Sequence, residues 1–208
     1  KFLRELHETG VKVVSVNNTH DYLLDRGIIP SMHVMLDARP DNVEFVQNPV
    51  DTCKYFLSSQ CDPAVFDALR KHEVFIYHVE SDSDVTTKAL DDYYKKHYLY
   101  IEGGTTVALR VLMLGHVLGF SFYDMFGFDS CVIGGKHHAY PQKLNDLDEI
   151  VEVRCNGRKF RCARWMVKQA QDFMKLIRFR GNLFHCNVRG DGLIAYMLKV
   201  GAEQLSEV

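Results

Sequence analysis

The sequence lacks several features that would assign a protein class directly. None of its six cysteines forms a CxxC pair with another, so zinc-finger and thioredoxin-type sites have no support. No apolar run is long enough to cross a bilayer, and no signal-peptide pattern opens the chain. The formal net charge is only −2 with both signs mixed, which argues against general nucleic-acid binding. We therefore expect no membrane and no nucleic acid as partner.

The length and the cysteines favour a single intracellular domain. A chain of 208 residues suits one α/β domain and can bury a core without disulfides. Most cysteines lie in apolar or strand-like contexts that favour reduced, buried thiols, so we expect a reducing, cytoplasmic compartment. Residue 1 is Lys rather than Met, which leaves open a preceding segment with a targeting signal. The oligomeric state is not indicated by any pattern.

Short β-branched runs alternate with helical patterns along the first part of the chain. After an opening helix at 2–9, strands are expected at 11–16, 32–36, 55–58, 74–78 and 122–126, and the last of these is expected to be buried. Helical patterns lie between them around 22–24, near 41, and at 64–69, 86–97 and 107–118. Such alternation implies crossover connections. The sequence therefore predicts a Rossmann-like α/β fold, a mostly parallel sheet with helices on both faces.

The C-terminal part departs from this alternation. Two alternating runs at 150–154 and 159–162 flank Asn156-Gly157, a strong hairpin signal, and a helix is expected from 163 to about 179. We interpret residues 130–180 as a loop, hairpin and helix insertion within one domain of residues 1–208. A final strand at 183–188 and a helix at 193–200 close the chain. The loop carries His137 and His138 and is either a lid that takes part in phosphate contact or proton transfer, or a plain surface loop.

A glycine-rich turn precedes the most apolar helical pattern. Gly103 and Gly104 are followed by Thr105 and Thr106 and then by the helix expected at 107–118. The free N–H groups and the positive dipole end of a helix N-terminus suit a phosphate. The alternative is an ordinary loop with a threonine N-cap, because the sequence has neither a Walker lysine pattern nor a complete dinucleotide fingerprint.

Polar residues and a glycine follow the expected strands, at the edge where open α/β sheets bind ligands. They are Asn17 and Asn18, Asp37 and Arg39, Ser59 and Gln60, and Gly127 and Asp129. Asp37 could bind a ribose hydroxyl or Mg²⁺, and Arg39 could bind a phosphate. Equally, Asn18 could simply cap a helix, and Asp37 could pair with Arg39 or cap the helix near residue 41.

Four ordered blocks resemble a known family. They are VVSVNNTHDYLLDRGIIPSMHVMLDARPDN, YFLSSQCDP, GGTTVALRVLMLGHVLGFSFYDMFGFDS and GDGLIAYM. Over roughly residues 11–197 the chain resembles the MptE-like domain, named for the archaeal 6-hydroxymethyl-7,8-dihydropterin pyrophosphokinase. That resemblance implies diphosphoryl transfer from ATP, with Mg²⁺, to a hydroxymethyl acceptor. Asp37 and Asp129 would hold the metal, and the turns at Asn17, Asn18 and residues 103–106 would contact phosphates.

The wider family also resembles the central domain of flagellin-modifying Maf glycosyltransferases and bacterial sialyltransferases. On that resemblance the donor would be a nucleotide-activated sugar such as a CMP-linked acid, and no metal would be required. His137, His138 or His185 would then act as the base on the acceptor hydroxyl. A non-catalytic nucleotide-binding module is a third alternative, because fold-level kinship does not decide chemistry. Under both transferase hypotheses, the protein would bind a nucleotide and a small-molecule acceptor.

Overall fold

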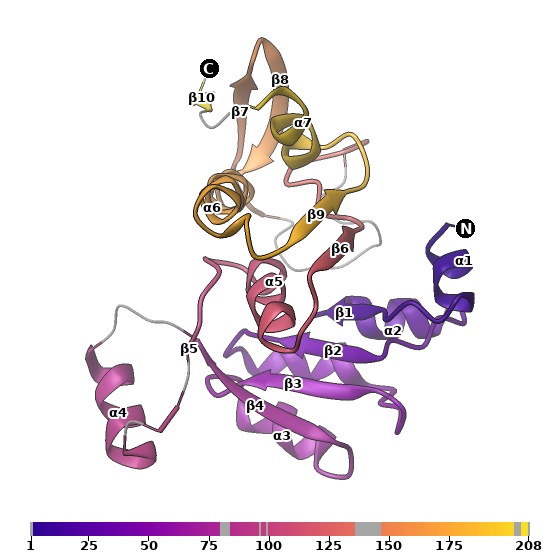
Figure 1. The fold of residues 1–208 in the computed structure, drawn as a ribbon, viewed down its shortest axis with the longest axis vertical. Helices are drawn as coiled ribbons and strands as arrows, with labels where there is room; N and C mark the ends of the chain where they lie inside the picture. Colours follow the sequence, from indigo (N-terminus) through magenta and orange to yellow (C-terminus); the bar gives the residue numbers. More distant parts are fainter. Residues whose placement is uncertain are drawn as a thin grey trace. The chain divides into compact units, whose positions relative to one another are not determined.

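The structure of the protein is a computed structural model, which describes residues 2–79, 84–95, 97–98, 100–135, 147–201 and 205–207. The chain divides into two compact units, Lys1–Glu102 and Gly103–Val208, called here the first unit and the second unit. Each unit contains its own strands and helices (Figure 1). His137 and His138, with most of the loop predicted as a lid, lie outside the described residues.

The first unit is built on a parallel sheet. Its five strands are β1 (Val14–Val16), β2 (Met32–Met35), β3 (Lys54–Ser58), β4 (Val74–Val79) and β5 (Tyr100–Ile101). They lie side by side in chain order, and each pairs in parallel with the next. All five strands therefore end at the same side of the sheet, which we call the carboxyl edge.

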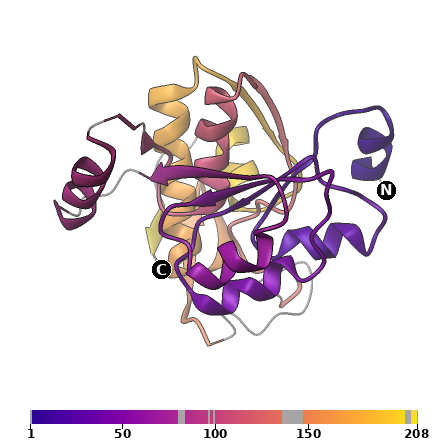
Figure 2. The ribbon, with the colours of Figure 1, turned by 90° about the horizontal axis from the view of Figure 1, so that it is seen from below.

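Helical segments precede and connect these strands. They are α1 (Phe2–Glu8), α2 (Thr19–Leu24), the 3₁₀ helix η1 (Pro40–Val46), α3 (Pro63–Leu69) and α4 (Asp84–Tyr94). The helix α2 contacts η1, and η1 contacts α3, so these three form one layer beside the sheet (Figure 2). Parallel crossovers share one hand, so strands in chain order place successive connections on the same face.

The local sequence explains the burial of the central strands and the start of α3. All four residues of β2 are buried, and in β3 only Lys54 is exposed. Continuous burial of this kind is typical of interior strands in parallel sheets. The carboxylate of Asp62 accepts a hydrogen bond from the N–H of Ala64, and Pro63 takes the first helical position, so α3 begins there.

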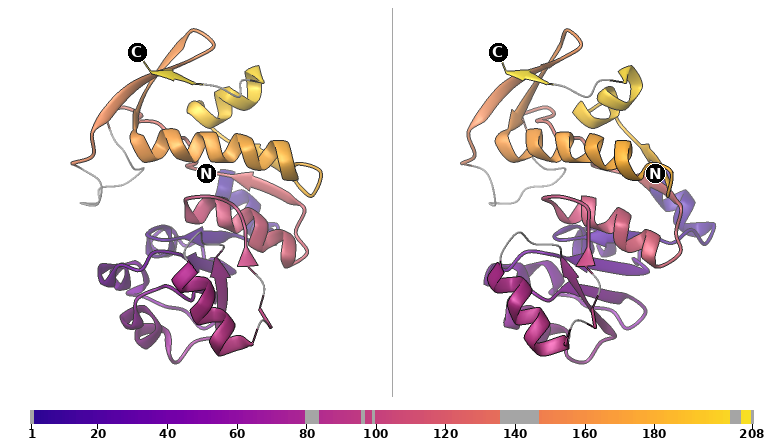
Figure 3. Two further views of the ribbon diagram at one scale, coloured as in Figure 1. Left: turned by 90° about the vertical axis from the view of Figure 1, so that its left-hand side faces the viewer. Right: turned by 60° about the vertical axis from the view of Figure 1, so that its left-hand side comes forward.

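The second unit begins with α5 (Val107–Val117) and the strand β6 (Phe122–Met125). The hairpin β7 (Ile150–Cys155) and β8 (Arg158–Ala163) follows, and then α6 (Arg164–Arg180), β9 (His185–Val188), α7 (Leu193–Val200) and β10 (Ser206–Glu207). The strands β6 and β9 pair in parallel, whereas β10 pairs antiparallel with β7 and makes the hairpin three-stranded. The helix α6 contacts α5, β8 and α7 (Figure 3).

The predicted fold class is confirmed. The structure has a Rossmann-like parallel sheet with helices, and a hairpin and helix follow near the C-terminus. The hairpin turns at Asn156 and Gly157 with φ values of 44° and 84°, as an Asn-Gly type I′ turn requires. The short strands β5 and β10 were not predicted, because two residues each are too few to produce a periodic pattern.

One burial prediction was wrong. The run at 122–126 reads as a buried strand, but Phe122 of β6 is 77% exposed. The reason is that β6 belongs to a sheet of two strands, where Phe122 pairs with His185 and stacks on its ring. Among the residues that the structure describes, no helix combines the length and the apolar character needed to span a bilayer.

Candidate functional site

The end of β2 is fixed by side chains from three other segments of the first unit. Three consecutive carbonyl groups accept hydrogen bonds: Met35 from the Tyr77 hydroxyl at 2.9 Å, Leu36 from Gln60 Nε2 at 2.9 Å, and Asp37 from Asn42 Nδ2 at 3.1 Å. These bonds satisfy backbone carbonyl groups at the point where the strand ends. The carboxyl edge is therefore a rigid support for the side chain of Asp37.

Asn17 and Asp37, both predicted as site residues, are brought together. Asn17 Nδ2 donates to Asp37 Oδ2 at 3.0 Å, and the Asn17 N–H bonds to the carbonyl of Val34 on β2. Asn17 has a φ of 42°, in the left-handed region that asparagine tolerates better than most residues. The left-handed turn directly after β1 is thus what directs this amide toward the end of β2.

Two amide oxygens at this edge have unused hydrogen-bonding capacity. Both Asn17 and Asn42 use their nitrogen to donate to Asp37, so the oxygen of each points elsewhere. Asn17 Oδ1 and Asn42 Oδ1 are buried and have no hydrogen-bond partner among the described residues. A buried acceptor left unpaired costs about 1–3 kcal/mol. The edge would therefore gain from a donor group or a cation supplied by a ligand.

These oxygens and the Asp37 carboxylate fit Mg²⁺ in chemical type. Mg²⁺ takes hard oxygen ligands and is bound in nucleotide sites by one or two carboxylates together with substrate phosphates. Within the described part of the chain, no three His, Cys, Asp or Glu side chains gather into a group that could hold a metal ion. Asp37 would therefore need the phosphates of a nucleotide to complete the ligands of a Mg²⁺ ion, and this role stays a prediction.

The remaining predicted residues of the first unit lie at or beside the same edge. Ser59 and Gln60 follow β3 and are exposed, and Arg39 is exposed directly before η1. Asn18 makes no side-chain cap bond to α2. Thr19 instead holds this turn, because its hydroxyl accepts from the N–H of Val16 and donates to the carbonyl of the same residue.

The glycine turn of the second unit packs closely on its own helix. Gly103 and Gly104 have φ values of 137° and 102°, a region that side chains rarely adopt. A Cβ atom on Gly103 would lie 2.7 Å from the carbonyl oxygen of Leu109 in the first turns of α5. The two glycines are therefore required by the path of the chain.

Both threonines of this turn are bonded to α6. The Thr105 hydroxyl donates to Asp172 Oδ2 at 3.1 Å, and Gln169 Nε2 donates to the Thr106 hydroxyl at 2.7 Å. The Ser130 hydroxyl donates to Gln169 Oε1 at 2.6 Å, which connects a second loop to the same helix. The hydroxyl groups predicted to meet a phosphate are thus already engaged within the second unit.

Asp129 and Gly127 follow β6, where Asp129 lies against the loop that precedes α7. Cβ atoms on Gly190 and Gly192 would lie 2.9 Å from Asp129 Oδ1 and 2.5 Å from Asp129 Cα. The N–H of Ile194 in α7 bonds to the Asp129 carbonyl at 3.4 Å. Burial raises the pKa of the Asp129 carboxyl above its ordinary value. The structure therefore gives Asp129 a packing role at the start of α7, and the predicted metal-binding role stays a prediction.

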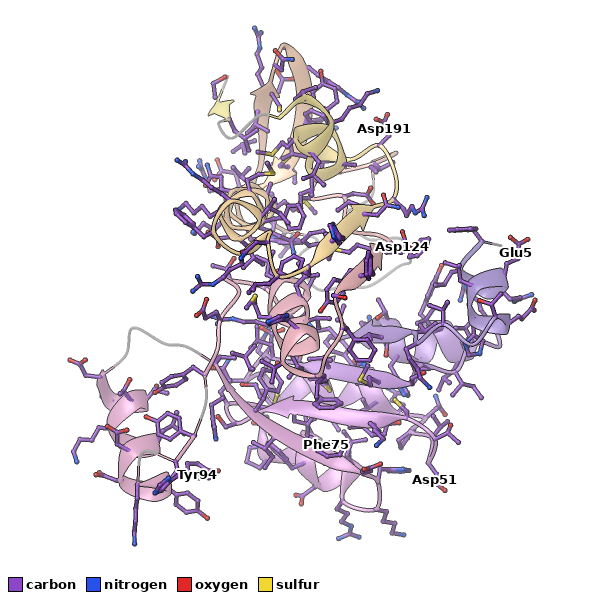
Figure 4. The ribbon with its side chains drawn as sticks, in the orientation of Figure 1. Glu5, Asp51, Phe75, Tyr94, Asp124 and Asp191 are labelled. Atoms are coloured by element: carbon purple, nitrogen blue, oxygen red, sulfur yellow. The ribbon has the colours of Figure 1, made fainter. Side chains whose placement is uncertain are left out.

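Two further carboxylates beside β6 and β9, Asp124 and Asp191, form ion pairs, and both residues are labelled in Figure 4. Arg189 Nε and Asn187 Nδ2 both donate to Asp124 Oδ1, and Arg158 donates with both terminal nitrogens to Asp191. His185, considered as a base in the glycosyltransferase reading, is exposed and stacks on Phe122.

The family model described as 6-hydroxymethylpterin diphosphokinase MptE-like matches residues 1–135 of the chain. The chain belongs to the MptE-like family. The match contains the whole first unit with its carboxyl edge, and it continues through α5 and β6.

A solved structure shares the fold of this MptE-like chain. The structure of the Maf glycosyltransferase from Magnetospirillum magneticum AMB-1 aligns with a TM-score of 0.61 and 18% sequence identity over 87% of this chain. The alignment covers 28% of that chain, so the MptE-like chain spans less than a third of its length. No curated protein matches the sequence.

Sequence reasoning missed residues that shape both units of the MptE-like chain. Asn42 shares the buried face of η1 with Phe45 and Val46, and Gln169 and Asp172 lie on the buried face of α6. Each is a polar residue at an apolar position of the pattern, which is the signal that could have identified them. Their partners are distant in sequence, so the pattern could indicate that a bond exists but not which group completes it.

Proposed function

We propose that this MptE-like chain is a nucleotide-dependent transferase that transfers a diphosphoryl group from ATP to a hydroxymethyl acceptor. The observation that supports the proposal is the carboxyl edge of the first unit, where Asp37 is held by Asn17 and Asn42 and two buried amide oxygens have no partner among the described residues. The family description, which names a diphosphokinase, favours ATP over other donors.

In this proposal the chain acts mainly by positioning. Asp37 would bind the Mg²⁺ that accompanies ATP, and the metal would neutralise part of the phosphate charge. Asn17 and Asn42 hold the carboxylate and the end of β2 in place, and Arg39 is the cation available to a phosphate at this edge. The acceptor oxygen forms a bond to the β-phosphorus, the bond between that phosphorus and the α-phosphate oxygen breaks, and AMP leaves. Asp129, Gly127 and the turn at residues 103–106 stay predicted ligand contacts in the second unit.

A second candidate is transfer from a nucleotide-activated sugar. The solved structure that shares this fold is a glycosyltransferase, and the fold alone is common to both chemistries. In that case Asp37 would accept a hydrogen bond from a ribose hydroxyl of the nucleotide instead of binding a metal.

The test is a thermal-shift screen with ATP, GTP, CTP, CMP and CMP-sugars, each with and without Mg²⁺. A ligand present at about 100 times its dissociation constant stabilises the folded protein by about 2.7 kcal/mol. We expect the largest shift with ATP and Mg²⁺, and a loss of that shift in Asp37→Asn. Asp41→Asn is the matched control, because Asp41 is an exposed carboxylate four positions further along the chain.

Other outcomes decide between the candidates. A metal-independent shift with CMP or a CMP-sugar would replace the first proposal with the second. A shift that persists unchanged in Asp37→Asn would remove the carboxyl edge of the first unit from the binding site. No shift with any nucleotide would overturn both transferase candidates.

A further inference from the structure

A serine and a histidine meet at the carboxyl edge one strand beyond Asp37. Ser59 directly follows β3, and its N–H bonds to the carbonyl of Tyr77 on β4 at 2.8 Å. The Ser59 hydroxyl lies 2.9 Å from Nδ1 of His78, the next residue of β4. Ser59 is exposed, whereas His78 is 7% exposed. The parallel pairing of β3 with β4 thus presents a hydroxyl to solvent with an imidazole behind it.

The surroundings of His78 keep its imidazole neutral and hold the ring in place. Burial lowers the pKa of His78 below its ordinary value of about 6.5, so the ring is neutral at pH 7. The rings of Tyr94 and Tyr98 pack against it with centroid separations of 4.8 and 5.7 Å, and Figure 4 labels Tyr94 on α4. A neutral imidazole that is fixed by packing and bonded to a hydroxyl is the arrangement by which enzymes remove a proton from that hydroxyl.

The pair also lies beside the proposed nucleotide site. Gln60, the neighbour of Ser59, donates to the carbonyl of Leu36, and Leu36 directly precedes Asp37. A group bound at the end of β2 would therefore have Ser59 and His78 next to it along the sheet edge. The positioning residues Asn17, Asp37 and Asn42 do not take part in proton transfer, so this task is open to the pair.

We propose that Ser59 contacts the acceptor hydroxyl of the transfer reaction and that the Ser59–His78 pair removes its proton. The inference rests on the proposed function. As the acceptor oxygen forms its bond to the β-phosphorus and the bond to the leaving AMP breaks, the acceptor proton moves to Ser59 Oγ. The proton of Ser59 moves in turn to His78 Nδ1. Ser59 is then the catalytic residue, and His78 acts through it.

The experiment measures AMP formed from ATP and Mg²⁺, with 6-hydroxymethyl-7,8-dihydropterin as the acceptor, over a range of pH. We expect Ser59→Ala and His78→Asn to lower kcat by about 10²- to 10⁴-fold, the usual contribution of general base catalysis. The affinity for ATP should stay within about twofold, because in this proposal the pair contacts the acceptor instead of the nucleotide contact predicted for Ser59. The acidic limb of the kcat profile, where protonation of His78 stops the reaction, should disappear in His78→Asn.

Controls separate this inference from a structural role and from the proposed function. His97→Asn replaces an exposed histidine of the same unit and should keep both rate and profile. Because His78 is buried, each variant is first compared with the parent chain by thermal unfolding, and Ser59→Ala changes an exposed side chain. Variants that retain kcat and the acidic limb would overturn the inference alone. A parent chain that forms no AMP would overturn the proposed function and this inference with it.

Discussion

The carboxyl edge of the first unit and the glycine turn of the second unit are both rich in polar residues beside strand or helix ends. At the first, Asn17 and Asn42 each keep a buried oxygen that has no partner among the described residues. At the second, the hydroxyls of Thr105 and Thr106 are already bonded to side chains of α6. The two regions therefore differ in the hydrogen-bonding capacity left for a ligand, although their residue types look alike in the sequence. Residue type alone identifies a polar turn. The hydrogen bonds that its side chains already make show whether the turn can still bind a ligand.

The largest expected effect is on the contact between Asp129 and the loop before α7, which lies in the second unit. Gly192→Ala would place a Cβ 2.5 Å from Asp129 Cα, although its φ of −75° suits alanine. We expect a loss of about 3 kcal/mol, the upper end of overpacking costs. Urea unfolding followed by the fluorescence of Trp165, the single tryptophan, reports on the second unit. Lys199→Ala on the exposed side of α7 should change stability by less than about 0.5 kcal/mol. Unchanged stability of Gly192→Ala would show that Asp129 and this loop are not in contact.

Gln169→Ala tests whether the glycine turn of the second unit is structural. It removes the bonds to Thr106 and Ser130, each worth about 1 kcal/mol net, so we expect a loss of about 2 kcal/mol. Nucleotide affinity should stay within about twofold if the turn is structural, because the bonds removed join the turn to α6 and not to a ligand. Gln171→Ala, two positions along the same helix, is the matched control. A large loss of affinity in Gln169→Ala would instead support the phosphate site predicted at residues 103–106.

Acid should destabilise the first unit more than the second. Burial, with a contribution from the neighbouring His20, lowers the pKa of His33 well below 6.5. The unfolded chain then takes up a proton near pH 6.5 that the folded chain does not, so stability falls as the pH drops below that value, by at most about 1.4 kcal/mol per pH unit. The raised pKa of Asp129 acts in the opposite direction, because the folded second unit holds its proton more tightly.

Hydrogen exchange measured between about pH 7.5 and pH 5.5 can follow the two units separately. Amides of β2 and β3 should lose protection on acidification, and His33→Gln should weaken that dependence. Equal acid sensitivity of His33→Gln and the parent chain would remove His33 as its cause.

Asn42→Ala should have the smallest effect on stability and a clear effect on binding. It removes the bond to the Asp37 carbonyl and also the unpaired amide oxygen, so we expect a net loss of about 1 kcal/mol or less. Nucleotide affinity measured by calorimetry should fall by about tenfold, because Asp37 loses its support. Asn48→Ala changes an exposed amide of the same unit and should leave affinity unchanged. A normal affinity in Asn42→Ala would show that the edge does not need this support.

Much of the fold could be predicted because its signals are local. The Asn156-Gly157 turn, the Pro63 start of α3 and the alternation of strands with helices each follow from residues close in sequence. The meeting of Asn17 with Asp37 follows from parallel strand ends sharing one edge.

The rest depends on contacts between distant segments. Gln169 bonds to Thr106 across 63 positions, and no periodic pattern identifies such a partner. The exposure of Phe122 likewise depends on β6 having β9 as its partner in a sheet of two strands. Sequence patterns report the tendency of each segment, and tertiary pairing decides which face of it is covered.

The chain-order arrangement of β1 to β5 also bears on synthesis by the ribosome. Each strand pairs with the one made just before it, so an emerging segment finds its docking surface already present. Contacts between near neighbours in sequence form quickly, and units made early fold early during translation. Newly made hydrophobic strands such as β2 and β3 are therefore exposed to solvent only for the time needed to make the next crossover.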